Sequence, residues 1–152
     1  MKLIISIALP LLVGGIAGFF TNTGVDGWYA VANKPSFNPT TWIFAPVWTS
    51  LYILMGIALY LVWKDDTGKP AKQTALLLFG VQLLLNFAWS FIFFYAAAPG
   101  WALVEIIIMW VAILLTILWF GKISSLAAWL LVPYICWVSF ATVLNFYIWK
   151  LN

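Results

Sequence analysis

The stretch KPSFNPTTWIFAPVWTSLYILMG, residues 34–56, leaves a polar loop and enters an apolar helix. Pro35 and Pro39 fix their own φ angles and push the residue before each of them toward extended geometry, so the loop is predicted to be rigid. Pro46 falls within the first turn or so of the apolar run, where a missing backbone N–H costs little. The stretch therefore predicts a stiff loop that leads directly into a long apolar helix.

In helical geometry this stretch gathers its aromatic and small residues on one side. Two neighbouring stripes carry them: Trp42, Pro46, Thr49, Ile53 and Gly56 on one, and Ala45, Trp48 and Tyr52 on the other. Such a side can hold a flat ligand. The alternative interpretation is a belt of Trp and Tyr that anchors the helix at the membrane interface, and the residues alone leave both open.

The composition of the whole chain excludes a soluble domain. Of its 152 residues, 66% are hydrophobic and 7% are charged, against about a quarter charged in ordinary soluble domains. The apolar runs approach or exceed the ~20 residues that cross a bilayer as a helix, and they lack the alternating pattern of a membrane barrel. We therefore expect an all-α polytopic membrane protein, a single domain over residues 1–152 with five transmembrane helices.

The five predicted spans cover approximately residues 3–20, 42–63, 72–95, 101–120 and 124–149. The polar segment 21–41 is too long for a simple hairpin and is predicted to be a lid or binding loop. Pro133 is expected to bend the fifth span, because an interior proline removes a backbone hydrogen bond. Gly14 and Gly18 let another helix approach closely, either within the molecule or across a homodimer.

The lysines predict the orientation in the membrane. Five of them fall on the N-terminal side of a five-span bundle and two on the other: Lys2, Lys64, Lys69, Lys72 and Lys122 against Lys34 and Lys150. The positive-inside rule then places the N-terminus in the cytoplasm, and the loop 21–41 and the C-terminus outside. Because the lysines are dispersed, they suit anionic lipid better than nucleic acid, which is not expected as a partner.

The chain offers few groups for metal chemistry or ordinary catalysis. It has no histidine and one cysteine, Cys136, so no disulfide within the chain, zinc site or conventional haem-iron site is expected. The absence of a histidine base and of a convincing acid/base pair also makes hydrolysis or dehydrogenation improbable.

Polar residues inside the apolar runs mark the faces that look inward. Gln82, Asn86 and Ser90 share one face of the third span with Trp89, for hydrogen bonds between helices or for contact with a ligand. In the fifth span one inward stripe carries Trp137, Ala141, Leu144 and Asn145. Glu105 is the one carboxylate within an apolar run. It is either a functional acid or an anion held by the dipole near a helix start.

Several motifs, in this order, resemble the translocator proteins, also called TspO, tryptophan-rich sensory proteins or peripheral benzodiazepine receptors. These are Trp28-Tyr29, the stretch 34–56, QLLLNFAWSFIFF at 82–94, Trp101 to Glu105, and PYICWVSFATVLNFYIW at 133–149. The likeness covers nearly the whole chain and is to bacterial-type members, which implies a bacterial cell membrane. It also implies a five-helix bundle, commonly a homodimer, that binds porphyrins such as protoporphyrin IX and isoquinoline-carboxamide (PK11195) or benzodiazepine ligands.

The resemblance places the binding residues in four spans and the first loop. They are Trp48, Tyr52, Asn86, Trp89, Trp101, Glu105, Trp137, Ala141 and Leu144, with Trp28 and Phe44 closing the pocket. We add Lys34 as a partner for porphyrin propionates at the outer mouth. The cholesterol pattern of animal members survives only loosely, since Phe146 stands where they carry a tyrosine, and no physiological sterol is expected.

Three functions follow from the resemblance. A porphyrin receptor in tetrapyrrole handling or stress signalling is preferred, with porphyrin as ligand rather than cofactor. The second is light- and oxygen-dependent porphyrin breakdown, in which Trp48 and Trp137 would exchange electrons with the illuminated ring. The third is a tetrapyrrole or lipid transporter with Glu105 as a protonation switch.

Overall fold

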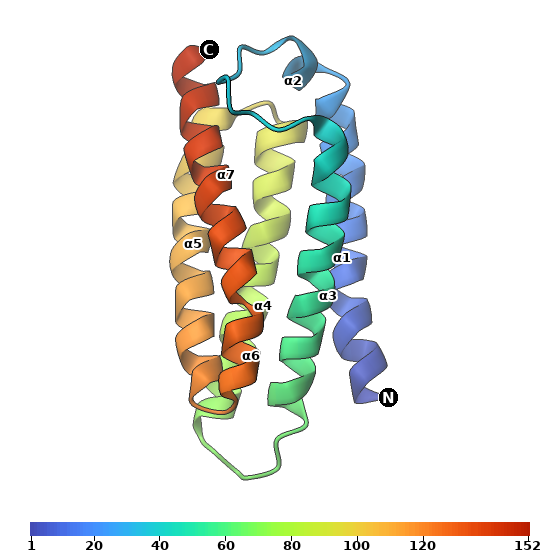
Figure 1. Ribbon diagram of the computed structural model, residues 1–152, viewed down its shortest axis with the longest axis vertical. Coiled ribbons are helices and arrows are strands. Elements are labelled where there is room, and N and C mark those ends of the chain that lie inside the picture. Colours follow the sequence, from blue (N-terminus) through green and yellow to red (C-terminus); the bar gives the residue numbers. More distant parts are fainter.

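The computed structural model describes all 152 residues and contains helices and loops only. Five helical units are long and apolar enough to cross a membrane: Lys2–Val25, Thr41–Trp63, Ala71–Tyr95, Pro99–Gly121 and Ser125–Leu151. They run side by side as one bundle (Figure 1). The predicted all-α membrane protein with five spanning helices is confirmed.

The structure has nine helical elements, of which all but α2 belong to these units. These are α1 (Lys2–Val25), α2 (Trp28–Val31), η1 (Thr41–Ile43), α3 (Phe44–Trp63), α4 (Ala71–Ser90), η2 (Phe91–Tyr95), α5 (Pro99–Gly121), α6 (Ser125–Leu130) and α7 (Val132–Leu151). α2 is a single turn in the first loop, η1 is a single turn that begins the second unit, and η2 is a π-helical turn that extends α4. Hence the predicted third span is one α-helix completed by a wider turn.

The packing order places α1 and α5 on opposite sides of the bundle. α1 packs against α3 and α4, whereas α5 packs against α4, α6 and α7. The two termini lie at opposite ends, and α2 covers the end at which the C-terminus lies (Figure 1). Large apolar side chains such as Ile4, Leu84 and Trp129 are exposed on the outer surface, as expected where the solvent is lipid.

α1 continues five residues beyond the predicted end of the first span, as far as Val25. The hydroxyls of two threonines there are satisfied within the helix, by carbonyls one turn back. Thr21 Oγ1 donates to the Ala17 carbonyl at 3.0 Å and Thr23 Oγ1 to the Phe20 carbonyl at 2.6 Å. Therefore the lid is shorter than predicted, and its first residues form part of the pocket wall.

The fifth span is broken near Pro133, where the sequence predicts a bend. α6 ends at Leu130 and α7 begins at Val132, with Pro133 in its first turn, where a proline is tolerated. α6 packs against α3, while α7 packs against α5. The break thus lets the lid half of the fifth span part from α3, and the space between them is where the pocket lies.

Candidate functional site: a pocket beneath the lid

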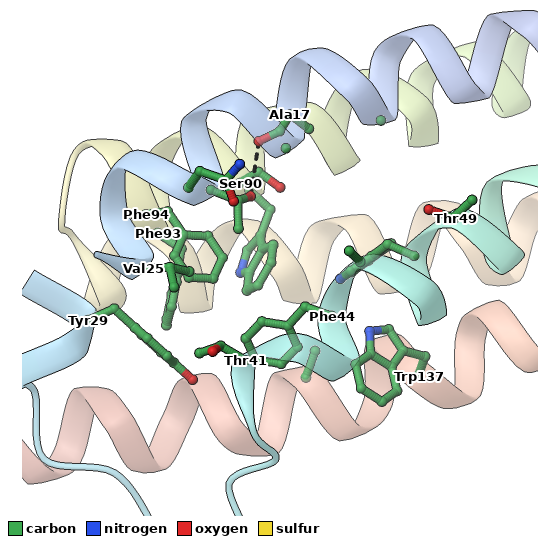
Figure 2. A pocket seen from close by; sticks show the side chains of 18 of the residues that line it. Ala17, Val25, Tyr29, Thr41, Phe44, Thr49, Ser90, Phe93, Phe94 and Trp137 are labelled. Carbon is green, nitrogen blue, oxygen red and sulfur yellow. Dashed lines mark hydrogen bonds between the residues drawn. The ribbon is translucent and has the colours of Figure 1, made fainter. Parts of the chain in front are cut away.

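A cavity of about 470 Å³ lies inside the lid half of the bundle. α1, α3, the α4–η2 unit and α7 form its walls, and α2 contributes to its roof. Figure 2 shows Tyr29, Phe93 and Phe94 clustered toward one end, Phe44 in the middle, and Trp137 with Thr49 toward the other. The volume is typical of a site for a drug-sized ligand.

Seven of the twelve residues proposed for binding line this cavity. They are Phe44, Trp48, Tyr52, Trp89, Trp137, Ala141 and Leu144. The two tryptophans named for photochemistry, Trp48 and Trp137, are among them. The other five, Trp28, Lys34, Asn86, Trp101 and Glu105, are not in the lining, and each has another position described below.

Paired aromatic rings give the cavity flat walls. Trp48 stacks on Tyr52 with ring centroids 5.7 Å apart and an interplanar angle of 29°. Trp89 stacks on Phe93 at 5.1 Å and 21°. Because each member of these pairs lines the cavity, their faces and edges are available to a planar guest.

A chain of buried hydrogen bonds fixes Tyr52 from behind. The Tyr52 hydroxyl donates to Asn86 Oδ1 at 2.7 Å, and Asn86 Nδ2 donates to the Tyr134 hydroxyl at 2.9 Å. Tyr134 in turn donates to Gln82 Oε1 at 2.7 Å. Gln82 and Asn86 therefore form hydrogen bonds between helices, which is one of the two interpretations left open for the polar face of the third span. Asn86 affects the pocket indirectly, through its bond to Tyr52.

A second polar junction holds Trp89. Its indole Nε1 donates to Asn145 Oδ1 at 3.0 Å, and Asn145 Nδ2 donates to the Pro99 carbonyl at 2.7 Å. One amide thereby joins α4, α5 and α7. The orientation of the Trp89 ring in the pocket wall is set by this junction.

One residue of the pocket lining carries a hydrogen-bond donor without a partner. Trp137 Nε1 is buried from solvent and bonds to no atom of the protein. Ser90 brings a hydroxyl to the same lining. Since a buried N–H without a partner is unfavourable, a ligand that accepts from Trp137 would gain more than its apolar contacts alone.

The lid closes the pocket through Tyr29 rather than Trp28. Tyr29 is 2% exposed, lines the cavity, and packs its ring 5.5 Å from Phe94 and 6.3 Å from Phe44. Its hydroxyl donates to Asn38 Oδ1 at 3.0 Å, and burial raises the pKa of this hydroxyl, so it is neutral at physiological pH.

Trp28 and Lys34 hold the lid from outside. Trp28 Nε1 donates to the Phe94 carbonyl at 2.9 Å, which ties α2 to η2. Lys34 Nζ lies 4.8 Å from the centre of the Tyr29 ring and donates to the Ala32 carbonyl at 3.2 Å. The Tyr29 ring, which lines the cavity, thus separates Lys34 from the cavity.

Trp101 and Glu105 lie elsewhere, in a shallow hollow between η2 and α5. α5 contributes no residue to the main cavity, because it packs on the far sides of α4 and α7. α5 also begins at Pro99, which puts Glu105 in its second turn rather than one turn from the start. The resemblance placed Trp101 and Glu105 in the pocket with residues of α3, α4 and α7, whereas the structure places them in a separate hollow.

The residues that sequence reasoning missed come from the lid and from α1. Tyr29 was named only as part of a motif, and Gly14, Gly15 and Gly18 line the cavity. A Cβ at Gly14 would overlap the Tyr52 ring, whereas open space surrounds the Cα positions of Gly15 and Gly18. The spacing of Gly14 and Gly18 was the available signal, and in this structure only Gly14 serves a close approach within the chain.

Comparison with known proteins points to one group. The model of the TspO/MBR family matches residues 6–150. The chain is 44% identical to the tryptophan-rich protein TspO of Chlorobaculum tepidum, over 100% of this chain and 96% of that one. It is 45% identical to the translocator protein of Homo sapiens, over 82% and 75% of the two chains. It is 37% identical to the tryptophan-rich sensory protein of Cereibacter sphaeroides, over 84% and 78%.

Proposed function

The chain belongs to the TspO/MBR family of integral membrane proteins, and this membership supports a role in binding or reception; from this premise we propose the ligands that its pocket binds. They are porphyrins such as protoporphyrin IX, and synthetic isoquinoline-carboxamide and benzodiazepine ligands. In the cell, such a receptor would serve tetrapyrrole handling or stress signalling. The cell is proposed to be bacterial.

The observation that carries this proposal is the aromatic slot beneath the lid. Stacked pairs on two walls present flat surfaces, and each aromatic contact with a guest is worth about 0.5–1.5 kcal/mol beyond the burial of area. Aliphatic residues of α7, such as Leu144, complete an apolar lining. A planar, mostly apolar molecule with few polar groups fits this chemistry better than a charged or sugar-like one.

Two positively polarised groups suit the polar ends of these ligands. Trp137 N–H can donate to a carbonyl or carboxylate inside the cavity. Lys34 can meet a porphyrin propionate at the outer mouth, since its ammonium already lies against the ring that forms the roof. A neutral isoquinoline would have no use for the lysine.

The test is a titration of purified protein with protoporphyrin IX and with PK11195, followed by quenching of tryptophan fluorescence. Lys34→Ala is expected to weaken porphyrin binding about tenfold, one charge-assisted contact, and to leave the isoquinoline nearly unchanged. Lys150→Ala, at the same end of the bundle, is the matched control. Equal losses of affinity for both ligands would show that Lys34 is not part of the site. If neither ligand quenched the tryptophan fluorescence, the proposed function would be overturned.

A light-dependent enzyme is the second candidate. The observation in its favour is that Trp48 and Trp137 line one cavity, with Trp48 stacked on Tyr52, so an excited porphyrin would have indoles beside it as electron donors. Illumination of the porphyrin complex in air should then give a new tetrapyrrole absorption spectrum that Trp137→Phe abolishes. Bleaching no faster than with an unrelated membrane protein would leave binding alone.

The structure gives less support to the remaining proposals. Glu105 does not line the cavity, so a carrier that uses it as a protonation switch lacks contact between switch and cargo. For the homodimer implied by the resemblance, the face at Gly14 already holds Tyr52, and Gly18 borders the cavity. We therefore propose that a dimer uses another face of the bundle.

A further inference from the structure

A second hollow opens on the outer surface of the bundle, in the half that carries the lid. It lies between the η2 turn with the residues that follow it and the first turns of α5. Apolar side chains form its walls, including Ile92 and Ala96 on one side and Val104 and Ile108 on the other. The hollow shares no residue with the cavity beneath the lid.

The one ionisable group in this hollow is Glu105. Its side chain is 8% exposed, and neither carboxyl oxygen has a hydrogen-bond partner in the protein. Since neither oxygen has a partner, none of the seven lysines bonds to this carboxyl group. A buried acid with two free acceptors and no counter-charge is unfavourable, and an acid in such a position marks a functional site.

An exposed indole stands next to this carboxyl. Trp101 is 76% exposed and precedes Glu105 by four residues, so both lie on one face of α5 and both line the hollow. Glu105 is roughly 9 Å along the axis from the helix start, at six residues of 1.5 Å each. Because α5 has 23 residues, about 34 Å of helix against about 30 Å of hydrocarbon, a centred α5 would hold Glu105 between the hydrocarbon edge and the bilayer centre.

We propose that this hollow is a second ligand site, entered from the lipid, which binds a lipophilic amine. The ammonium group pairs with the carboxylate of Glu105 and lies against the Trp101 ring, and the alkyl part follows Val104 and Ile108 along α5. A carboxylate beside an aromatic face is the combination that recognises ammonium groups in apolar surroundings.

Other lipid-soluble guests fit the hollow less well. An alcohol or a fatty acid can offer Glu105 hydrogen bonds only, whereas an amine can take up the proton of the buried acid and form an ion pair with it. The ammonium of phosphatidylethanolamine stands next to a phosphate that Glu105 would repel. Hence the amine is expected to be a free amphiphile and not a lipid headgroup.

The experiment uses the full chain in dodecyl maltoside, which carries no charge. N,N-dimethyldodecylamine is the probe, because a tertiary amine cannot form an amide with an activated carboxyl group. We expect it to protect Glu105 from dicyclohexylcarbodiimide, measured by peptide mass spectrometry, at concentrations where dodecanol of the same chain length does not. Equal protection by dodecanol would overturn the proposal, and equal protection by added phosphatidylethanolamine would overturn the choice of a free amine.

Direct binding of the radiolabelled amine tests the same residues in another way. Glu105→Gln keeps the shape of the side chain and should weaken binding at least tenfold, and Trp101→Leu should weaken it severalfold. Asp65→Asn, in the loop at the opposite end, is the matched control and should bind as the wild type does. An unchanged melting temperature shows that each variant is folded. Unchanged amine binding by Glu105→Gln would overturn the proposal. This outcome does not depend on whether the main cavity binds porphyrin.

Discussion

At the scale of single residues, two neighbouring glycines of α1 have opposite requirements. A Cβ at Gly14 would overlap the Tyr52 ring, so Gly14→Ala must displace the tyrosine from its bond to Asn86. We expect a loss of roughly 1–3 kcal/mol of stability, the usual result of leaving a buried polar group without its partner, together with weaker ligand binding. Thermal unfolding in detergent and ligand titration measure the two effects.

Gly15→Ala is the matched control for this prediction. No atom lies near a Cβ built there, and alanine favours a helix interior over glycine by roughly 0.5–1 kcal/mol. The melting temperature should therefore stay constant or rise. Equal destabilisation by both substitutions would mean that α1 rejects any side chain on this face, and that Tyr52 is not the reason.

The same scale shows which site residues a sequence can identify. Helical periodicity puts Trp137 on an inward stripe and puts Trp48 and Tyr52 on a common side, but it leaves that side open between a ligand face and an interfacial belt, and the family resemblance decides between the two. Tyr29 could not be found this way. Its position in the roof depends on contacts with Asn38 and Phe94, which are distant in sequence or lie in a loop without periodicity.

At the scale of helical elements, the break between α6 and α7 shapes the cavity. Pro133→Ala restores a backbone N–H and removes the clash that separates the two segments, so they should merge into one straighter helix. We expect a modestly higher melting temperature at most, because Pro133 lies in the first turn of α7, where a proline costs little. Ligand affinity should fall about tenfold as α7 moves toward α3. Higher stability with unchanged affinity would show that the break does not shape the cavity.

Element boundaries and neighbours were predictable to different degrees. The number of spanning helices followed from apolar length, since each run is close to what a bilayer requires. The end of α1 did not, because hydropathy ends the span at the polar residues after Phe20, whereas the helix continues through them with the hydroxyls of Thr21 and Thr23 bonded to its own carbonyls. The order of the helices did not follow from the sequence either. Glu105 was expected beside pocket residues of α3 and α7, but the packing of α5 places it in a separate hollow.

At the scale of the whole molecule, the distribution of charge predicts how the bundle sits in a membrane. Five of the seven lysines lie at the end that holds the N-terminus and the loops after α3 and α5, and the lid lies at the other end (Figure 1). The positive-inside rule therefore predicts a cytoplasmic N-terminus and a lid that faces outward. In a Cys136→Ser background, Ser36→Cys in the lid should react with a membrane-impermeant maleimide on intact cells, whereas Thr67→Cys in the α3–α4 loop should react only after lysis. The reverse pattern would invert the molecule, and ligands would then reach the lid from the cytoplasm.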